Sequence, residues 1–105
     1  QRQMCIRDRY GGEEFLILFS GYTRKQAGKI LEGMLTNFRN QEYDFLPEDV
    51  IITFSAGFTY LDNKNIDVEG FIKCADEALY YSKEHGRNQI TYYNDLRLRD
   101  MQVNR

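Results

Sequence analysis

The sequence is poor in cysteine and proline and has no long hydrophobic run. Its two cysteines, Cys5 and Cys74, are too few for a disulfide framework and lack metal-ligand spacing, which fits a reducing compartment. No apolar run reaches the length of a bilayer span, and the first residues contain no apolar signal core. We therefore expect this segment to be cytoplasmic and to make no membrane contact. Membrane anchoring of the parent protein through upstream segments stays open.

An excess of charge of one sign is also lacking. Fourteen Lys and Arg residues face sixteen Asp and Glu residues, a formal net charge of −2. This balance argues against a nucleic-acid partner, so any polyanion must be bound by a few well-placed cations. The length of 105 residues sets a ceiling of one domain, and 42% hydrophobic with 29% charged residues is typical of a folded globular protein.

The apolar pattern predicts a strand and then a helix in the first half of the chain. Residues 15–19 are wholly apolar, which is typical of a buried central strand. Apolar residues then recur in steps of three and four from Ala27 to Phe38, which predicts an amphipathic helix. Thr23 is the expected N-cap, and the helix is expected to end near Asn40.

A strand, a helix and a last strand are predicted after a surface loop. Residues 51–60 alternate between apolar and small polar side chains, the period of a half-buried strand. Asp67 is suited to cap a second helix, and Gly86 to end it. Residues 89–93 form the predicted last strand. The order strand, helix, strand, helix, strand places the chain in the α/β or α+β class, a sheet covered by two helices.

Two glycines and two acids stand together just before the first predicted strand. Gly11 and Gly12 allow a backbone to approach a bulky anion, and the carboxylates of Glu13 and Glu14 are suitable ligands for a divalent metal. A hairpin turn flanked by solvated acids explains the same residues without any function. On an extended segment the two acidic side chains point to opposite sides, so they are not expected to share one role.

Lys83 and Arg87 bracket the predicted end of the second helix. Two cations near one opening are suited to grip a triphosphate. The helix dipole alone also favours cations at this position, which is the structural alternative. His85, between them, is expected to have only a structural role.

Taken together, these patterns resemble the GGDEF family of diguanylate cyclases over residues 9 to 94. Three matches carry the resemblance: residues 9–15 in the GGEEF form of the naming motif, residues 53–57 as a strand that ends in Ser-x-Gly, and residues 75–80 with Lys83, Gly86, Arg87 and Asn88 as the closing helix and its turn. The resemblance implies the C-terminal half of a nucleotidyl-cyclase, palm-like domain, an α+β sandwich with an antiparallel-containing sheet and two helices.

The resemblance also implies an activity and a role for each candidate residue. Two domains in a homodimer would each bind GTP with two Mg²⁺ ions and together form cyclic di-GMP, releasing pyrophosphate. Glu13 would be the metal ligand and candidate base, and Glu14 would support the metal and the substrate. Gly11 and Gly12 would let the backbone approach the nucleotide, while Lys83 and Arg87 would hold the β- and γ-phosphates.

Several parts of the family pattern do not occur in these 105 residues. The first metal-binding aspartate and the guanine-reading Asn and Asp would precede the glycines, where only residues 1–8 stand. We therefore expect the fragment itself to be inactive. Cys5 replaces the aspartate of an Arg-x-x-Asp inhibitory site that would begin at Arg2. Residues 1–8 do not show the apolar pattern expected of a strand that leads into the glycines. One interpretation is that they are an artefactual segment outside the family. Residues 95–105 form a charged tail.

Two other functions remain open from the sequence. The first is a non-catalytic GGDEF module that acts as a nucleotide-binding receptor or as a regulatory partner. The second is a small α/β interaction domain without a nucleotide site, in which the glycines form a turn and the cations a solvated rim.

Overall fold

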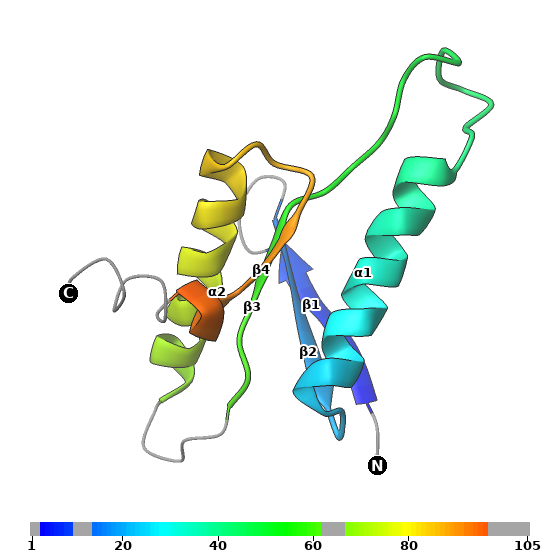
Figure 1. The fold of residues 1–105 in the computed structure, drawn as a ribbon. Helices are drawn as coiled ribbons and strands as arrows, with labels where there is room; N and C mark the ends of the chain where they lie inside the picture. The colour runs from blue at the N-terminus through cyan, green and yellow to red at the C-terminus, as the bar shows by residue number, and fades with distance from the viewer. Residues whose placement is uncertain (1–2, 10–13, 62–66, 97–105) are drawn as a thin grey trace. The chain divides into compact units, whose positions relative to one another are not determined.

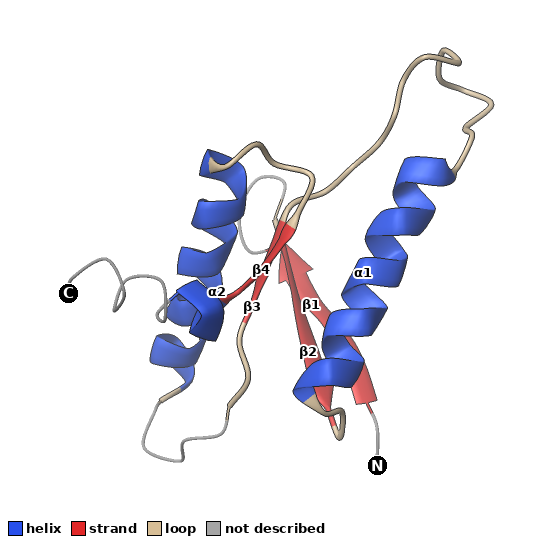
Figure 2. Cartoon of the chain, in the orientation of Figure 1, coloured by secondary structure: helices blue, strands red, loops and turns tan. Residues whose placement is uncertain are grey.

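The computed structural model describes residues 3–9, 14–61 and 67–96, and of the first of these ranges only the backbone. Within these residues the chain is a mixed α/β protein (Figures 1 and 2). Its elements are β1 (Gln3–Arg9), β2 (Phe15–Ser20), α1 (Arg24–Asn40), β3 (Ala56–Phe58), α2 (Val68–Glu84) and β4 (Ile90–Tyr92). They belong to two compact units, Gln1–Ile30 and Leu31–Arg105.

The first unit contains an antiparallel pair of strands, β1 and β2. The register runs from Gln3 opposite Ser20 to Ile6 opposite Ile17, and it shifts before Arg9 pairs with Phe15. The predicted element order, which begins with a strand over residues 15–19, is wrong at its start, because the strand β1 precedes them. Antiparallel pairing rests on backbone hydrogen bonds, so a segment without an apolar pattern still forms a strand.

Strand β2 is less covered than its wholly apolar sequence predicts. Phe15 is 64% exposed and Leu18 is 46% exposed. Among the strands that the structure describes, β2 pairs with β1 alone. The prediction of a buried central strand is therefore wrong for the described sheet.

Helix α1 begins and ends where the sequence predicts. Thr23 Oγ1 accepts a hydrogen bond from the backbone N–H of Gln26 at 3.1 Å, and the side chain of Gln26 accepts from the N–H of Thr23 at 2.9 Å. This reciprocal pair is a capping box, which satisfies two of the free donors at a helix start. The apolar stripe of the helix includes the buried Leu31 and Leu35.

The second unit is organised around β3, α2 and β4. Strand β3 pairs with β4 in parallel, from Ala56 opposite Ile90 to Phe58 opposite Tyr92. The predicted strand over residues 51–60 is therefore too long, since β4 offers only three residues as partners. A parallel pair requires a crossover connection, and α2 provides it by packing along β3 (Figure 1).

Helix α2 is fixed at its start by Asp67, as predicted. The Asp67 carboxylate accepts a hydrogen bond from the backbone N–H of Gly70 at 2.7 Å. Further along, Ala78 and Ser82 are fully buried. The Ser82 hydroxyl donates to the carbonyl of Ala56 at 2.8 Å and lies 2.7 Å from the hydroxyl of Thr91. This bond network ties the helix to both strands of the unit.

Gly57 allows the close approach of β3 to α2. A Cβ atom built on Gly57 would meet the backbone of Leu79, and it would lie 2.5 Å from the carbonyl oxygen of Ala75 and the carbonyl carbon of Ala78. These atoms belong to the helix backbone and have no freedom to rotate away. A glycine is thus required at this position for the observed packing.

Candidate functional site

The acidic part of the predicted site is described only at Glu14. Gly11, Gly12 and Glu13 lie outside the residues that the structure describes. Glu14 is half-buried and immediately precedes β2. Its carboxylate has the oxygen donors that Mg²⁺ prefers, so its chemistry fits the predicted metal. The role of these four residues stays a prediction.

The basic part of the predicted site lies at the end of α2. Lys83 is half-buried in the last turn of the helix, and the exposed Arg87 follows in the turn beyond it. The N–H of Arg87 donates to the carbonyl of Ser82 at 2.9 Å, and Gly86 has a φ of 107°. This left-handed glycine with a bond back into the last turn is a Schellman ending, which places both cations at one end of the helix.

The turn after α2 is unusual because two residues other than glycine follow Gly86 in the left-handed region. Arg87 has a φ of 59° and Asn88 a φ of 52°. Such backbone conformations are uncommon for residues with a Cβ and persist where neighbouring contacts hold them. The amide of Gln89 supports the turn from within, since it donates to the carbonyls of His85 and Arg87 at 2.6 and 3.2 Å.

Asn88 is also bonded to two distant parts of the second unit. Arg39 Nε donates to Asn88 Oδ1 at 2.7 Å, and Arg39 Nη2 donates to the Asn88 carbonyl at 2.9 Å. The N–H of Asn88 donates to Ser55 Oγ at 3.1 Å. Sequence reasoning did not find Arg39, because a single cation at a helix end gives no signal of a partner 49 positions away.

The arrangement of Lys83 and Arg87 is chemically suited to a polyphosphate. A guanidinium binds phosphate oxygens with two parallel N–H groups, while an ammonium group acts as a compact point charge. Both side chains start from a backbone that the Schellman ending and the Asn88 contacts hold in place. A turn held by such bonds is expected to lose less conformational freedom on binding than an unsupported one.

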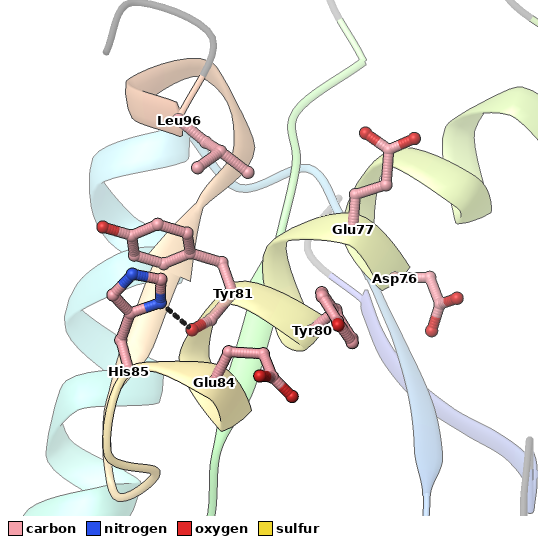
Figure 3. Close-up of a pocket in the computed structure, with 7 residues that line it drawn as sticks. All are labelled: Asp76, Glu77, Tyr80, Tyr81, Glu84, His85 and Leu96. Atoms are coloured by element: carbon pink, nitrogen blue, oxygen red, sulfur yellow. Dashed lines mark hydrogen bonds between the residues drawn. The ribbon is translucent and has the colours of Figure 1, made fainter. Parts of the chain in front are cut away.

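A hollow of about 400 Å³ lies along α2 and reaches its end at Glu84 and His85 (Figure 3). Its lining is acidic and aromatic: Asp76, Glu77, Tyr80, Tyr81, Glu84, His85 and Leu96. The His85 ring stacks on Tyr81 at 3.7 Å, and its Nδ1–H donates to the Tyr81 carbonyl at 2.9 Å. His85 therefore completes the helix end, in line with its predicted structural role. The three carboxylates make this hollow unsuitable for a triphosphate.

The acidic and basic parts of the predicted site belong to different units. Glu14 lies in the first unit, and Lys83 and Arg87 lie in the second. Both cations thus lie at the end of α2, while their spatial relation to Glu14 stays a prediction. Within the described ranges, no group of three or more His, Cys, Asp or Glu side chains is placed to hold a metal, and Glu13 is outside those ranges. No helix in the same ranges is long and apolar enough to cross a membrane.

Comparison with known proteins identifies the family of this chain. The class that these features define is a small mixed α/β domain with a basic turn after its second helix. The family model described as "Diguanylate cyclase, GGDEF domain" matches residues 2–89. The chain therefore belongs to the GGDEF domain family.

Three curated relatives are described as diguanylate cyclases. Diguanylate cyclase A of Treponema denticola is 30% identical over 86 residues, which cover 79% of this chain and 22% of the relative. Diguanylate cyclase DgcP of Pseudomonas aeruginosa is 32% identical over 89 residues, 85% of this chain and 13% of the relative. Diguanylate cyclase DosC of Escherichia coli K12 is 31% identical over 83 residues, 78% of this chain and 18% of the relative. The chain thus spans less than a quarter of the length of these relatives.

Proposed function

We propose that this chain is part of a diguanylate cyclase that condenses two GTP molecules into cyclic di-GMP. Membership of the GGDEF domain family is the observation that carries the proposal. The basic turn at the end of α2 supports it, because Lys83 and Arg87 provide the charge that a triphosphate needs. The proposed fold of the complete domain is a nucleotidyl-cyclase, palm-like domain to which residues 9–94 contribute the C-terminal half.

In the proposed reaction, each 3′-hydroxyl oxygen forms a bond to the α-phosphorus of the other GTP. The bond between that phosphorus and the oxygen that bridges to the β-phosphate breaks. Two pyrophosphates and two protons leave for each cyclic di-GMP formed. Because each nucleotide attacks the other, the reaction needs two domains face to face, so we propose a homodimer as the catalytic form.

The residues of this chain have distinct proposed roles in that reaction. Lys83 and Arg87 hold the β- and γ-phosphates and so fix the leaving group. Gly11 and Gly12 leave room for the nucleotide beside the backbone. Glu13 binds metal and accepts the proton of the attacking hydroxyl, and Glu14 supports the metal and substrate side. Two Mg²⁺ ions, when bound, neutralise phosphate charge and acidify the attacking hydroxyl.

The 105 residues alone are proposed to be inactive. The metal-binding aspartate and the guanine-reading residues that the family pattern implies do not occur between Gln1 and Gly11. A site with the phosphate-binding cations but without base recognition would hold GTP weakly. The full-length protein is therefore the right material for the test.

The test is product formation by the full-length protein from GTP and Mg²⁺. We expect one cyclic di-GMP and two pyrophosphates per two GTP consumed, and loss of the product when EDTA removes the metal. Glu13→Gln should abolish product formation, while Glu48→Gln, an exposed carboxylate in the loop after α1, should leave it unchanged. Binding of GTP without product in the unchanged protein would overturn the cyclase proposal in favour of a nucleotide-binding receptor module.

The dependence of the reaction rate on protein concentration tests the proposed homodimer. Because the reaction requires two domains, the initial rate should rise more steeply than in proportion to protein concentration until the dimer saturates. A rate strictly proportional to concentration across the range in which sedimentation shows a monomer would contradict the homodimer.

A further inference from the structure

The turn that carries Arg87 needs support from outside itself. Two consecutive residues with a Cβ, Arg87 and Asn88, adopt the left-handed conformation, with φ values of 59° and 52°. Arginine is disfavoured in this region, whereas asparagine visits it more readily, so the conformation of Arg87 in particular is held by its surroundings. Arg87 is bonded directly to Ser82 and Gln89, and the contacts of Asn88 hold the residue that follows it, which adds to the support of its direction.

These contacts come from Arg39 and Ser55. A single guanidinium bonds both the side-chain oxygen and the main-chain oxygen of Asn88, at 2.7 and 2.9 Å. It thereby restrains the side-chain torsion and the backbone of the same residue. Ser55 Oγ accepts from the Asn88 N–H at 3.1 Å and completes the set. Three polar groups of Asn88 are thus used to fix one turn.

Arg39 is well placed for this task. It lies in the last turn of α1, a helix of 17 residues. Its guanidinium is planar and always charged, so both N–H groups point at Asn88 in a fixed geometry. A lysine has one compact donor group and does not reproduce the two bonds.

We propose that Arg39 is a positioning residue for the nucleotide: through Asn88 it holds Arg87 in the direction that meets the terminal phosphates of GTP. This inference rests on the proposed function. Arg39 itself makes no contact with the nucleotide in the proposed arrangement, and its effect on binding passes through Arg87. Loss of Arg39 therefore loosens the turn. Arg87 keeps its charge, but its side chain is no longer held in the same direction.

The test measures binding to the full-length protein of α,β-methylene GTP, in which the bond that the reaction breaks is replaced. Titration calorimetry with Mg²⁺ gives the dissociation constants of this analogue and of GMP, which lacks the terminal phosphates. We expect Arg87→Ala to weaken binding of the analogue about tenfold and to leave GMP unaffected, since hydrogen bonds to charged groups carry such effects. Arg39→Ala should weaken binding of the analogue about three- to tenfold, again without an effect on GMP.

The double variant distinguishes positioning from an independent contribution. If Arg39 acts through Arg87, the variant that combines both changes should bind the analogue no more weakly than Arg87→Ala alone. Multiplying effects, or an Arg39→Ala protein with unchanged affinity, would overturn the inference. Lys29→Ala, an exposed cation on the same helix, is the matched control and should bind as the unchanged protein does.

Conservative variants keep the test decisive if Arg39→Ala does not fold. Arg39→Lys retains the charge, and Asn88→Gly retains the left-handed backbone while removing Oδ1. Each should weaken binding of the analogue about threefold, because one of two bonds is lost. Unchanged binding in both would refute the positioning role. Cyclic di-GMP formation, measured separately, reports on the cyclase proposal. If the enzyme forms the product and binds the analogue equally well without Arg39, only the positioning role is overturned.

Discussion

Gly57 in β3 lies so close to the backbone of Leu79 in α2 that no side chain fits between them. We predict that Gly57→Ala forces the strand away from the helix and destabilises the protein by about 1–3 kcal/mol or more. Urea unfolding followed by circular dichroism measures the change. Gly33→Ala is the matched control, because a Cβ at this position of α1 meets nothing within 4 Å. That change should stabilise the protein by about 0.5–1 kcal/mol, and equal behaviour of the two variants would contradict the packing.

Ser82→Ala should also destabilise the protein, for a different reason. It leaves the carbonyl of Ala56 and the hydroxyl of Thr91 without the partner that they share in the buried interior. The expected loss is about 1–3 kcal/mol in the free energy of unfolding. Ser20→Ala, at an exposed position at the end of β2, should change it by less than about 0.5 kcal/mol. A Ser82→Ala protein as stable as the Ser20→Ala control would show that the network contributes nothing.

The cap of α2 gives a third prediction. Asp67→Ala removes the acceptor of the Gly70 N–H and should lower stability by about 0.5–2 kcal/mol. Asp67→Asn keeps an oxygen acceptor and should retain most of the stability. Hydrogen exchange at the amide of Gly70 distinguishes the variants, since only the alanine variant should exchange markedly faster. Equal exchange in all three proteins would mean that the cap is not formed in solution.

Lys83→Ala should raise the KM for GTP about tenfold, because a charge-assisted contact to phosphate is lost. The difference from the unchanged protein should shrink as salt is added, since counterions screen a partly exposed charge. Steady-state rates at low and high ionic strength measure both effects. Lys73→Ala provides the comparison, as Lys73 is an exposed cation of the same helix, away from its end. Equal KM values for the two variants would remove Lys83 from the phosphate site.

Where local chemistry decides, the sequence was a sufficient guide to the fold. Thr23 and Asp67 each cap a helix through a bond to a residue three positions away, so both helix starts were predictable. Gly86 marked the end of α2 through another local signal, a glycine in the left-handed conformation just after the helix. Strand limits depend on the partner strand, and alternation over residues 51–60 did not reveal that only Ala56–Phe58 would find one.

The positions of the two candidate cations were predictable from the sequence, whereas the contacts that support the turn around them were not. Lys83 and Arg87 were visible as cations around a helix end, and the structure places both there. The bond between Arg39 and Asn88 was not visible, because it joins residues 49 positions apart that share no pattern. Long-range polar contacts of this kind depend on the angle between a helix end and a turn, which composition and periodicity do not encode.

The parallel pairing of β3 with β4 has a consequence for the order of folding. No short hairpin can join parallel strands, so Ala56 meets Ile90 only after the intervening chain has closed a long loop. The pair has three residues on each side, too few to compensate for that closure alone. Helix α2 must therefore form and dock first, and the two strands are expected to join late along the folding pathway, on a surface that the helix has already built.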